Sequence, residues 1–129
     1  AQGFLTDRVV DLLRSQGIAR SLVDLGESRA LGSRPDGEPW RVALQHPENP
    51  QAADLTLALT DGAVATSGPY GFRFSAEGAF NHLFDPRTGA CATRYASVSV
   101  VMPTATAADA LATAFTLMGP TEISRVVRS

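Results

Sequence analysis

The residues best suited to chemistry lie in two short stretches of the second half of the chain. The first, residues 82–89, reads His-Leu-Phe-Asp-Pro-Arg-Thr-Gly and places a histidine three residues before an aspartate at a sharp turn. Histidine followed by a carboxylate can hydrogen-bond a substrate phosphate and transfer a proton near neutral pH. A structural interpretation fits equally: His82 as a hydrogen-bonding group at a strand end, and Asp85 opening a turn that Gly89 closes. Spacing alone leaves both interpretations open.

The second stretch contains Asp109 and Thr113, which are four residues apart and therefore share one flank of a helix. Their oxygens suit Mg²⁺, because this ion takes few protein ligands and fills its octahedron with water and substrate phosphate. The alternative is structural: Thr106 and Asp109 have the spacing of a capping box, in which a carboxylate answers the unpaired N–H groups of the first helical turn. The pair alone does not decide between these roles.

Two amphipathic helices are expected to position these residues. Apolar side chains spaced three and four apart predict helices over residues 4–16, with a stop at Gly17, and over residues 106–118. The start of the first helix is a place where an anion such as phosphate is favoured. Residues 121–129 are expected to form a short helix or strand. The side chains expected to face the core are Leu5, Val9, Leu12 and Leu13 in the first helix and Ala108, Leu111, Phe115 and Met118 in the second.

The remaining elements are expected to be strands joined by turns. Asp61-Gly62 predicts a hairpin between residues 53–59 and 63–67, and the turn Ser75-Ala-Glu-Gly predicts another between residues 70–74 and 80–84. Pro35-Asp-Gly predicts a tight reversal, and the β-branched run at residues 95–102 a central strand. Further strands are predicted over residues 21–25 and 40–44. The expected fold class is α+β, an antiparallel sheet of hairpins with amphipathic helices packed on one face.

Length and composition bound the class of protein. The 129 residues allow one modest core, and 11 basic against 13 acidic side chains give a net charge of −2. This balance offers no electrostatic footprint for nucleic acid or an anionic membrane surface. No stretch approaches the roughly 18 apolar residues of a spanning helix. The single cysteine, Cys91, excludes an internal disulfide.

Several blocks together resemble the ApbE family, the FAD:protein FMN transferases. Residues 82–89 resemble its His-x-x-Asp-Pro-x-Thr-Gly block, and residues 108–114 resemble its Ala-Asp-Ala-Leu-Ala-Thr-Ala helix. Residues 65–70 match Ala-Thr-Ser-Gly-x-Tyr. Two blocks depart from the family pattern. Residues 1–7 resemble Ala-Lys-Gly-Tyr-x-x-Asp with Gln2 in place of lysine, and residues 25–32 begin like the family's Leu-Gly-Gly-Asn and end in glycine, with Glu27 and Ser28 at the second glycine and the asparagine.

The resemblance implies Mg²⁺-dependent transfer of FMN from FAD to a threonine of an acceptor protein, with release of AMP. In this interpretation Asp109 and Thr113 bind Mg²⁺, together with a main-chain carbonyl ahead of Ala1, and His82 and Asp85 are catalytic. The residues expected to contact FAD are Gln2, Asp7, Gly26, Glu27, Ser67, Gly68, Arg87 and Thr88.

The resemblance also implies a setting and leaves alternatives. The acceptor is expected to be a flavoprotein subunit of a bacterial electron-transfer system, and the enzyme is expected in the periplasm or anchored on the periplasmic side of the membrane. Residues 1–129 are expected to be the C-terminal part of a single flavin transferase domain, with the N-terminal part outside this sequence. Two other functions stay open: an FAD pyrophosphatase that yields FMN and AMP, and a non-catalytic flavin-binding or interaction module, which the departures at Gln2 and Glu27 favour.

Overall fold

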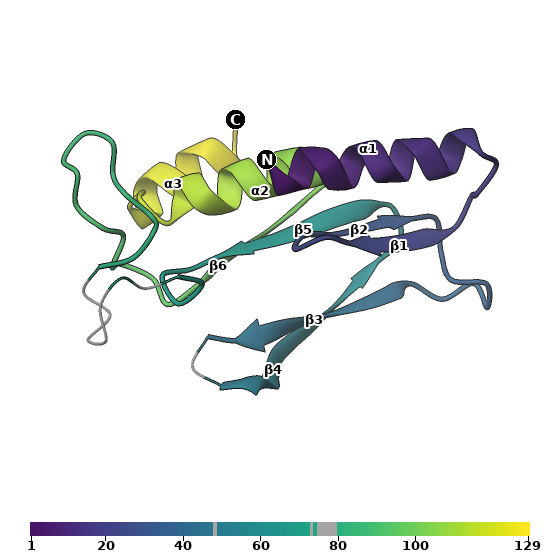
Figure 1. Ribbon diagram of the computed structural model, residues 1–129, viewed down its shortest axis with the longest axis horizontal. Helices are drawn as coiled ribbons and strands as arrows, with labels where there is room; N and C mark the ends of the chain where they lie inside the picture. Colours follow the sequence, from purple (N-terminus) through teal and green to yellow (C-terminus); the bar gives the residue numbers. More distant parts are fainter. Residues whose placement is uncertain (48, 73, 75–79) are drawn as a thin grey trace.

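A computed structural model describes residues 1–47, 49–72, 74 and 80–129 of the chain, and the elements below are those of this part. They follow in the order α1 (Gln2–Ser15), β1 (Ser21–Asp24), β2 (Ser28–Leu31), β3 (Trp40–His46), β4 (Asn49–Leu59), β5 (Gly62–Ser67), β6 (Val98–Met102), α2 (Ala105–Phe115) and α3 (Pro120–Val127) (Figure 1).

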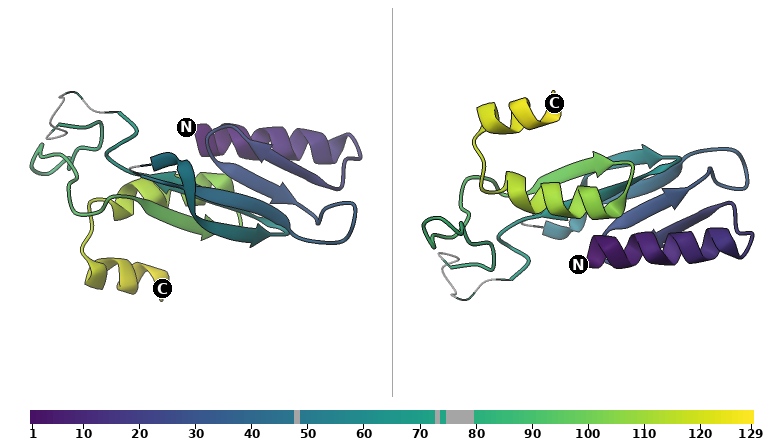
Figure 2. Two further views of the ribbon diagram at one scale, coloured as in Figure 1. Left: turned by 90° about the horizontal axis from the view of Figure 1, so that it is seen from below. Right: turned by 90° about the horizontal axis from the view of Figure 1, so that it is seen from above.

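The strands form two antiparallel sheets. A four-stranded sheet has the order β1-β2-β5-β6, and β3 and β4 form a separate two-stranded ribbon. Helices α1 and α2 cover one face of the larger sheet, and the ribbon lies on the other (Figure 1). Helix α3 lies beyond α2, on the side away from α1 (Figure 2). The predicted α+β class, with helices packed on one face of an antiparallel sheet, is confirmed.

Alternation along β5 divides the core into two clusters. Ala63 and Ala65 are buried against α2, whereas Val64 points to the opposite face and packs with Ala30 and Leu59 below the sheet. This period of two is the expected geometry of a strand buried on both faces. The first cluster is made of alanines, which lets α2 lie close to β5. The partners of Ala63 and Ala65 on α2 are Ala105, Ala108 and Ala112.

The predicted hairpin between residues 53–59 and 63–67 is wrong. Strand β4 pairs with β3, and β5 pairs with β2 and β6. The chain leaves the ribbon and enters the sheet at this turn, where the Asp61 carboxylate accepts a hydrogen bond from the Gly32 amide at 2.9 Å. Long-range pairing with β2 therefore prevails over the local turn signal.

Two other strand predictions also needed correction. Strand β6 lies at the edge of the four-stranded sheet within the described residues, not at its centre. Strand β2 was not anticipated, because Ser-Arg-Ala-Leu has no β-branched residue; it is held by β1 on one side and β5 on the other.

The predicted reversal before β3 is confirmed by a hydrogen bond from the Gly37 amide to the Arg34 carbonyl, at 2.9 Å. The predicted strands at residues 70–74 and 80–84 are wrong, because the described residues of these ranges belong to no strand. The Phe74 amide does donate a hydrogen bond to the Phe80 carbonyl at 2.8 Å, and the predicted turn at residues 75–78 lies outside the described residues.

Helix α1 forms as predicted but buries a different face. Of the predicted apolar stripe, Val9 and Leu13 are half-buried, while Leu5 and Leu12 are 55% and 61% exposed. The reason is its contact with α2, which requires small or hydrogen-bonding side chains. The buried residues of α1 are Gly3, Thr6, Asp7 and Val10.

Helix α2 begins one residue earlier than predicted, at Ala105. Its N-cap is Thr104, whose hydroxyl oxygen accepts a hydrogen bond from the Ala107 amide at 3.3 Å. The capping box predicted for Thr106 and Asp109 is therefore wrong. The predicted core residues Ala108 and Phe115 are buried. Helix α3 resolves the choice left open for the last residues, and no helix in the described ranges is long and apolar enough to cross a membrane.

Candidate active site

One cavity gathers most of the residues singled out from the sequence. It has a volume of about 410 Å³ and lies where the start of α1, the β1–β2 turn, the end of β5 and α2 meet. Segments far apart in the chain thus contribute to one site. Its lining consists of Gln2, Glu27, Thr66, Ser67, Gly68, Tyr70, Gly71, His82, Leu83, Asp109 and Thr113.

Asp109 and Thr113 supply oxygen atoms to one wall of the cavity. Oδ2 of Asp109 accepts a hydrogen bond from the Gly3 amide at 3.0 Å, and Oγ1 of Thr113 lies 3.1 Å from Oγ of Ser67. The Asp109 side chain keeps 23% of its surface exposed. No group of three His, Cys, Asp or Glu side chains with metal-binding geometry occurs in the part of the chain that the structure describes. The hard oxygen donors present nevertheless fit Mg²⁺, since this ion needs few protein ligands.

The backbone next to His82 is anchored by a buried asparagine, Asn81. The Asn81 side chain is fully buried, donates to the Ala92 carbonyl and accepts from the Leu83 amide, both at 2.9 Å. Nδ1 of His82 lies 3.2 Å from the carbonyl oxygen of Phe72. Because a carbonyl only accepts, this bond places a proton on Nδ1, and in the neutral form of the ring Nε2 then has the lone pair. Neutral His82 can therefore take a proton at Nε2.

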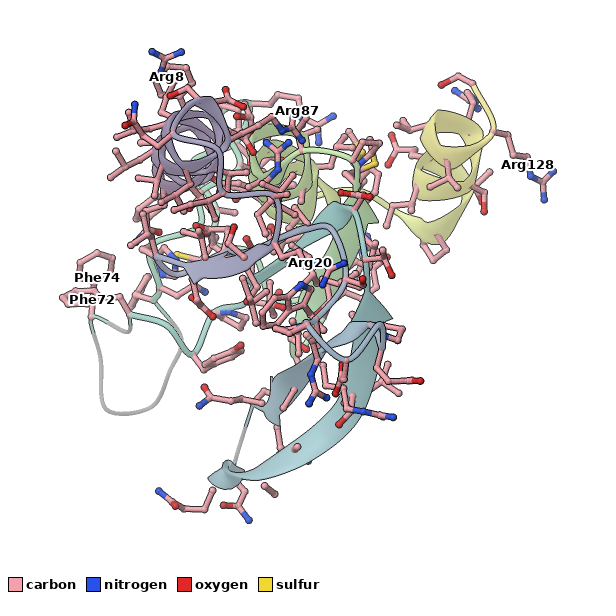
Figure 3. The ribbon with its side chains drawn as sticks, turned by 90° about the vertical axis from the view of Figure 1, so that its right-hand side faces the viewer. Arg8, Arg20, Phe72, Phe74, Arg87 and Arg128 are labelled. Atoms are coloured by element: carbon pink, nitrogen blue, oxygen red, sulfur yellow. The ribbon has the colours of Figure 1, made fainter. Side chains whose placement is uncertain are left out.

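The ring of Phe72 marks the outer edge of this region. Phe72 and Phe74 lie next to each other and point away from the sheet, with their ring centroids 5.2 Å apart (Figure 3). His82 thus stands at the boundary between the cavity and an exposed aromatic surface.

Glu27 brings a second carboxyl group to the cavity. Only 7% of its surface is exposed, and Oε2 has no hydrogen-bond partner among the described residues. Burial raises the pKa of this carboxyl, and the nearby negative charge of Asp109 raises it further. A buried carboxyl oxygen without a partner is costly, so a ligand group that hydrogen-bonds it would relieve a real penalty.

Backbone conformation at Gly26 and close packing at Gly68 explain why these two positions are glycine. Gly26 follows β1 with φ +107°, a conformation that favours glycine, and lines a neighbouring cavity of about 340 Å³ that shares Thr66 and Tyr70 with the first. At Gly68 a Cβ atom would lie 2.8 Å from the Ala96 carbonyl oxygen. Close packing therefore explains the glycine at 68 without a ligand.

Five candidate residues do not line the main cavity: Gly26, which lines the neighbouring one, and the four residues described next. Asp7 bonds instead to the start of α2. Asp85 and Arg87 pair with each other through Nη2 and Oδ2 at 3.0 Å, and hydrogen bonds from Arg87 lower the pKa of Asp85. Thr88 accepts a hydrogen bond from the Ala90 amide at 3.2 Å. The contacts of Asp85, Arg87 and Thr88 account for a tight turn. The catalytic role of Asp85 and the contacts of Asp7, Arg87 and Thr88 with FAD stay predictions.

Sequence reasoning gave several residues at the site no role, and two of them, Tyr70 and Asn81, bear on its geometry. Tyr70 lines the cavity, and its place in the Ala-Thr-Ser-Gly-x-Tyr block was the available signal. Asn81, which precedes His82, is buried and bonds to Leu83 and Ala92. A single asparagine beside a histidine carries no pattern that distinguishes it from a surface residue.

Known proteins resemble this chain in sequence and in fold. The chain is 39% identical over 123 residues to the FAD:protein FMN transferase of Vibrio cholerae, covering 92% of this chain and 37% of that protein. The ApbE protein of Thermotoga maritima superposes with a TM-score of 0.86 at 32% identity, over 97% of this chain and 41% of that one. The flavinyl transferase ApbE of Pseudomonas stutzeri, in its apo form, gives a TM-score of 0.75 at 36% identity, over 93% and 38%.

These proteins are longer than the present chain, which spans about two fifths of their length. The model of the ApbE family matches residues 1–129. The chain belongs to the ApbE family.

Proposed function

We propose that the protein to which this chain belongs transfers FMN from FAD to a threonine hydroxyl of an acceptor protein and releases AMP, in a reaction that requires Mg²⁺. The observation that carries the proposal is the single cavity that joins His82, whose Nδ1 lies 3.2 Å from the Phe72 carbonyl oxygen, to the oxygens of Asp109 and Thr113. The relatives named FAD:protein FMN transferase support it.

In the proposed reaction the threonine oxygen forms a bond to the FMN phosphorus of FAD. The bond between that phosphorus and the bridging oxygen breaks, and AMP leaves with the bridging oxygen. The hydroxyl proton moves to Nε2 of His82, while the Phe72 carbonyl holds the Nδ1 proton and thereby fixes the ring orientation. Asp109 and Thr113 would hold Mg²⁺, which supplies positive charge to the phosphates.

We assign the binding of the nucleotide part of FAD to Glu27 and Gln2. Glu27 presents a buried carboxyl oxygen without a partner, and a Cβ atom at Gly26 would lie 3.1 Å from the Gln2 amide nitrogen, so both side chains meet at the β1–β2 turn. A neutral glutamine cannot supply the charge of the family's lysine. Binding here would therefore depend on hydrogen bonds more than on ion pairing with the pyrophosphate.

The acceptor and the location follow from the family resemblance. The proposed acceptor is a flavoprotein subunit of a membrane-bound electron-transfer system, and the proposed location is the bacterial periplasm or the periplasmic side of the membrane. Both are tested by identifying the protein that becomes covalently flavinylated in the native cell.

The direct test is intact-mass analysis of an acceptor incubated with the whole protein, FAD and Mg²⁺. Wild type should add one FMN unit to the acceptor, and Asp109→Ala and His82→Ala should slow this addition by about 10²-fold or more. Asp11→Ala and His46→Ala are matched controls, since Asp11 is exposed on α1 and His46 ends β3 outside the cavity. AMP formation without a mass gain on the acceptor would instead indicate a pyrophosphatase. Bound FAD with no AMP would indicate a binding module.

A further inference from the structure

Asp7 connects three elements around the cavity although it does not line it. Its carboxylate is buried, with 8% of the residue surface exposed. Oδ1 accepts a hydrogen bond from the Ala105 amide at 2.9 Å and pairs with Arg29 of β2. Oδ2 accepts from the amide and the hydroxyl of Thr106, at 2.9 Å and 2.5 Å. Asp7 of α1 therefore accepts hydrogen bonds from the backbone N–H groups in the first turn of α2.

A carboxylate of α2 likewise accepts a hydrogen bond from the start of α1. Asp109 of α2 accepts from the amide of Gly3 in the first turn of α1, at 3.0 Å. Each helix thus supplies the acceptor for unpaired N–H groups at the start of the other. Close approach makes this possible, because a Cβ atom at Gly3 would lie 2.7 Å from Cβ of Asp109 and still closer to the Ala105 carbonyl oxygen.

This exchange fixes the position of the oxygens proposed to bind the metal. Asp109 lies one helical turn after Ala105, and Thr113 lies one turn further, so a shift at the start of α2 moves both. Arg29 pairs with the Asp7 carboxylate and so connects it to β2, the strand that directly follows Glu27. Burial alone raises the pKa of Asp7, but the hydrogen bonds from Thr106, Ala105 and Arg29 outweigh it and the pKa lies below its ordinary value. Asp7 is therefore charged at neutral pH.

We propose that Asp7 is a positioning residue for the metal-binding pair: through the start of α2 it sets the place of Asp109 and Thr113 in the cavity. The inference rests on the proposed function, since it takes these two residues as the metal ligands. It assigns Asp7 no contact with FAD or metal, which distinguishes it from the expectation that Asp7 belongs to the FAD site.

The test measures Mn²⁺ binding, as a probe for Mg²⁺, by calorimetry on the whole protein. Asp7→Asn keeps an acceptor for the Ala105 amide but loses the charge, and it should weaken Mn²⁺ binding by about 10-fold. Asp7→Ala should weaken it further, toward about 100-fold. Asp11→Asn removes an exposed carboxylate from the same helix and should bind Mn²⁺ as wild type does. Thr106→Ala removes one donor to Asp7 and provides a milder variant if the Asp7 variants fold poorly.

Kinetics separate positioning from a general loss of fold. In a folded Asp7→Asn protein the Mg²⁺ concentration for half-maximal transfer should rise by about 10-fold, while saturating Mg²⁺ restores most of the maximal rate. Folded Asp7→Asn and Thr106→Ala proteins with wild-type Mn²⁺ affinity would overturn the inference and leave the proposed function intact. Equal Mn²⁺ affinity of wild type and Asp109→Ala would overturn both.

Discussion

Replacing Gly3 by alanine should separate α1 from α2. The added methyl carbon would lie 2.7 Å from Cβ of Asp109, whereas carbon atoms in contact prefer about 3.5–4.0 Å, so the helices must move apart by roughly 1 Å. Overpacking of this kind costs about 1–3 kcal/mol. The same shift would stretch the hydrogen bond from the residue 3 amide to the Asp109 carboxylate, now 3.0 Å, and such charge-assisted bonds contribute about 1.5–3 kcal/mol. Alanine has a better helix propensity than glycine, which offsets about 1 kcal/mol of this loss of stability.

The net expectation is a destabilisation of roughly 2–4 kcal/mol, which lowers the melting temperature. Thermal melting followed by circular dichroism measures it, and Mn²⁺ titration should show weaker binding at the displaced Asp109. Gly62→Ala is the matched control, because its added methyl would have its nearest contact at 3.5 Å, with the Met102 carbonyl oxygen. A Gly3→Ala protein as stable as Gly62→Ala, with unchanged Mn²⁺ affinity, would refute the close-contact reasoning.

Two further predictions concern buried polar groups. Asn81→Ala leaves the Leu83 amide and the Ala92 carbonyl without their partner, so the free energy of unfolding measured with urea should fall by roughly 2–4 kcal/mol. FMN transfer should also slow, because the backbone next to His82 is no longer anchored. Unchanged stability would contradict the burial argument. Glu27 has a folded-state pKa above its ordinary value of 4.5, so its contribution to stability is present below pH 4.5 and is lost as the pH rises through the folded pKa. Glu27→Gln should therefore melt a few degrees higher than wild type at pH 8 and gain less at pH 4, and an equal gain at both pH values would exclude ionisation as the cause.

The sequence predicted the elements better than their partners. Periodicity located α1, α2 and most strands, because these signals are local. The Asp61-Gly62 turn failed as a hairpin signal because β5 finds its partners in β2 and β6. The exposed Leu5 and Leu12 show the same limit for a helix: spacing predicts an apolar face, but the contact of Gly3 with α2 decides which face is buried.

The candidate site divides in a similar way. Residues in family blocks, such as His82, Asp109 and Thr113, were found from the sequence and lie together in one cavity. The position of Asp7 was found as well, but its carboxylate bonds to the start of α2, a contact between residues about a hundred positions apart. No local pattern distinguishes a carboxylate that binds a ligand from one that accepts hydrogen bonds from the backbone amides of a distant helix.

The most direct test of the central claim is a crystal structure of the whole protein as the His82→Ala variant, with FAD and Mn²⁺ and without an acceptor. The account predicts anomalous density for manganese at about 2 Å from oxygens of Asp109 and Thr113, with the FAD pyrophosphate beside it and the FMN phosphorus facing residue 82. Manganese bound elsewhere, or FAD seated only in the cavity between the four-stranded sheet and the β3–β4 ribbon, would contradict it.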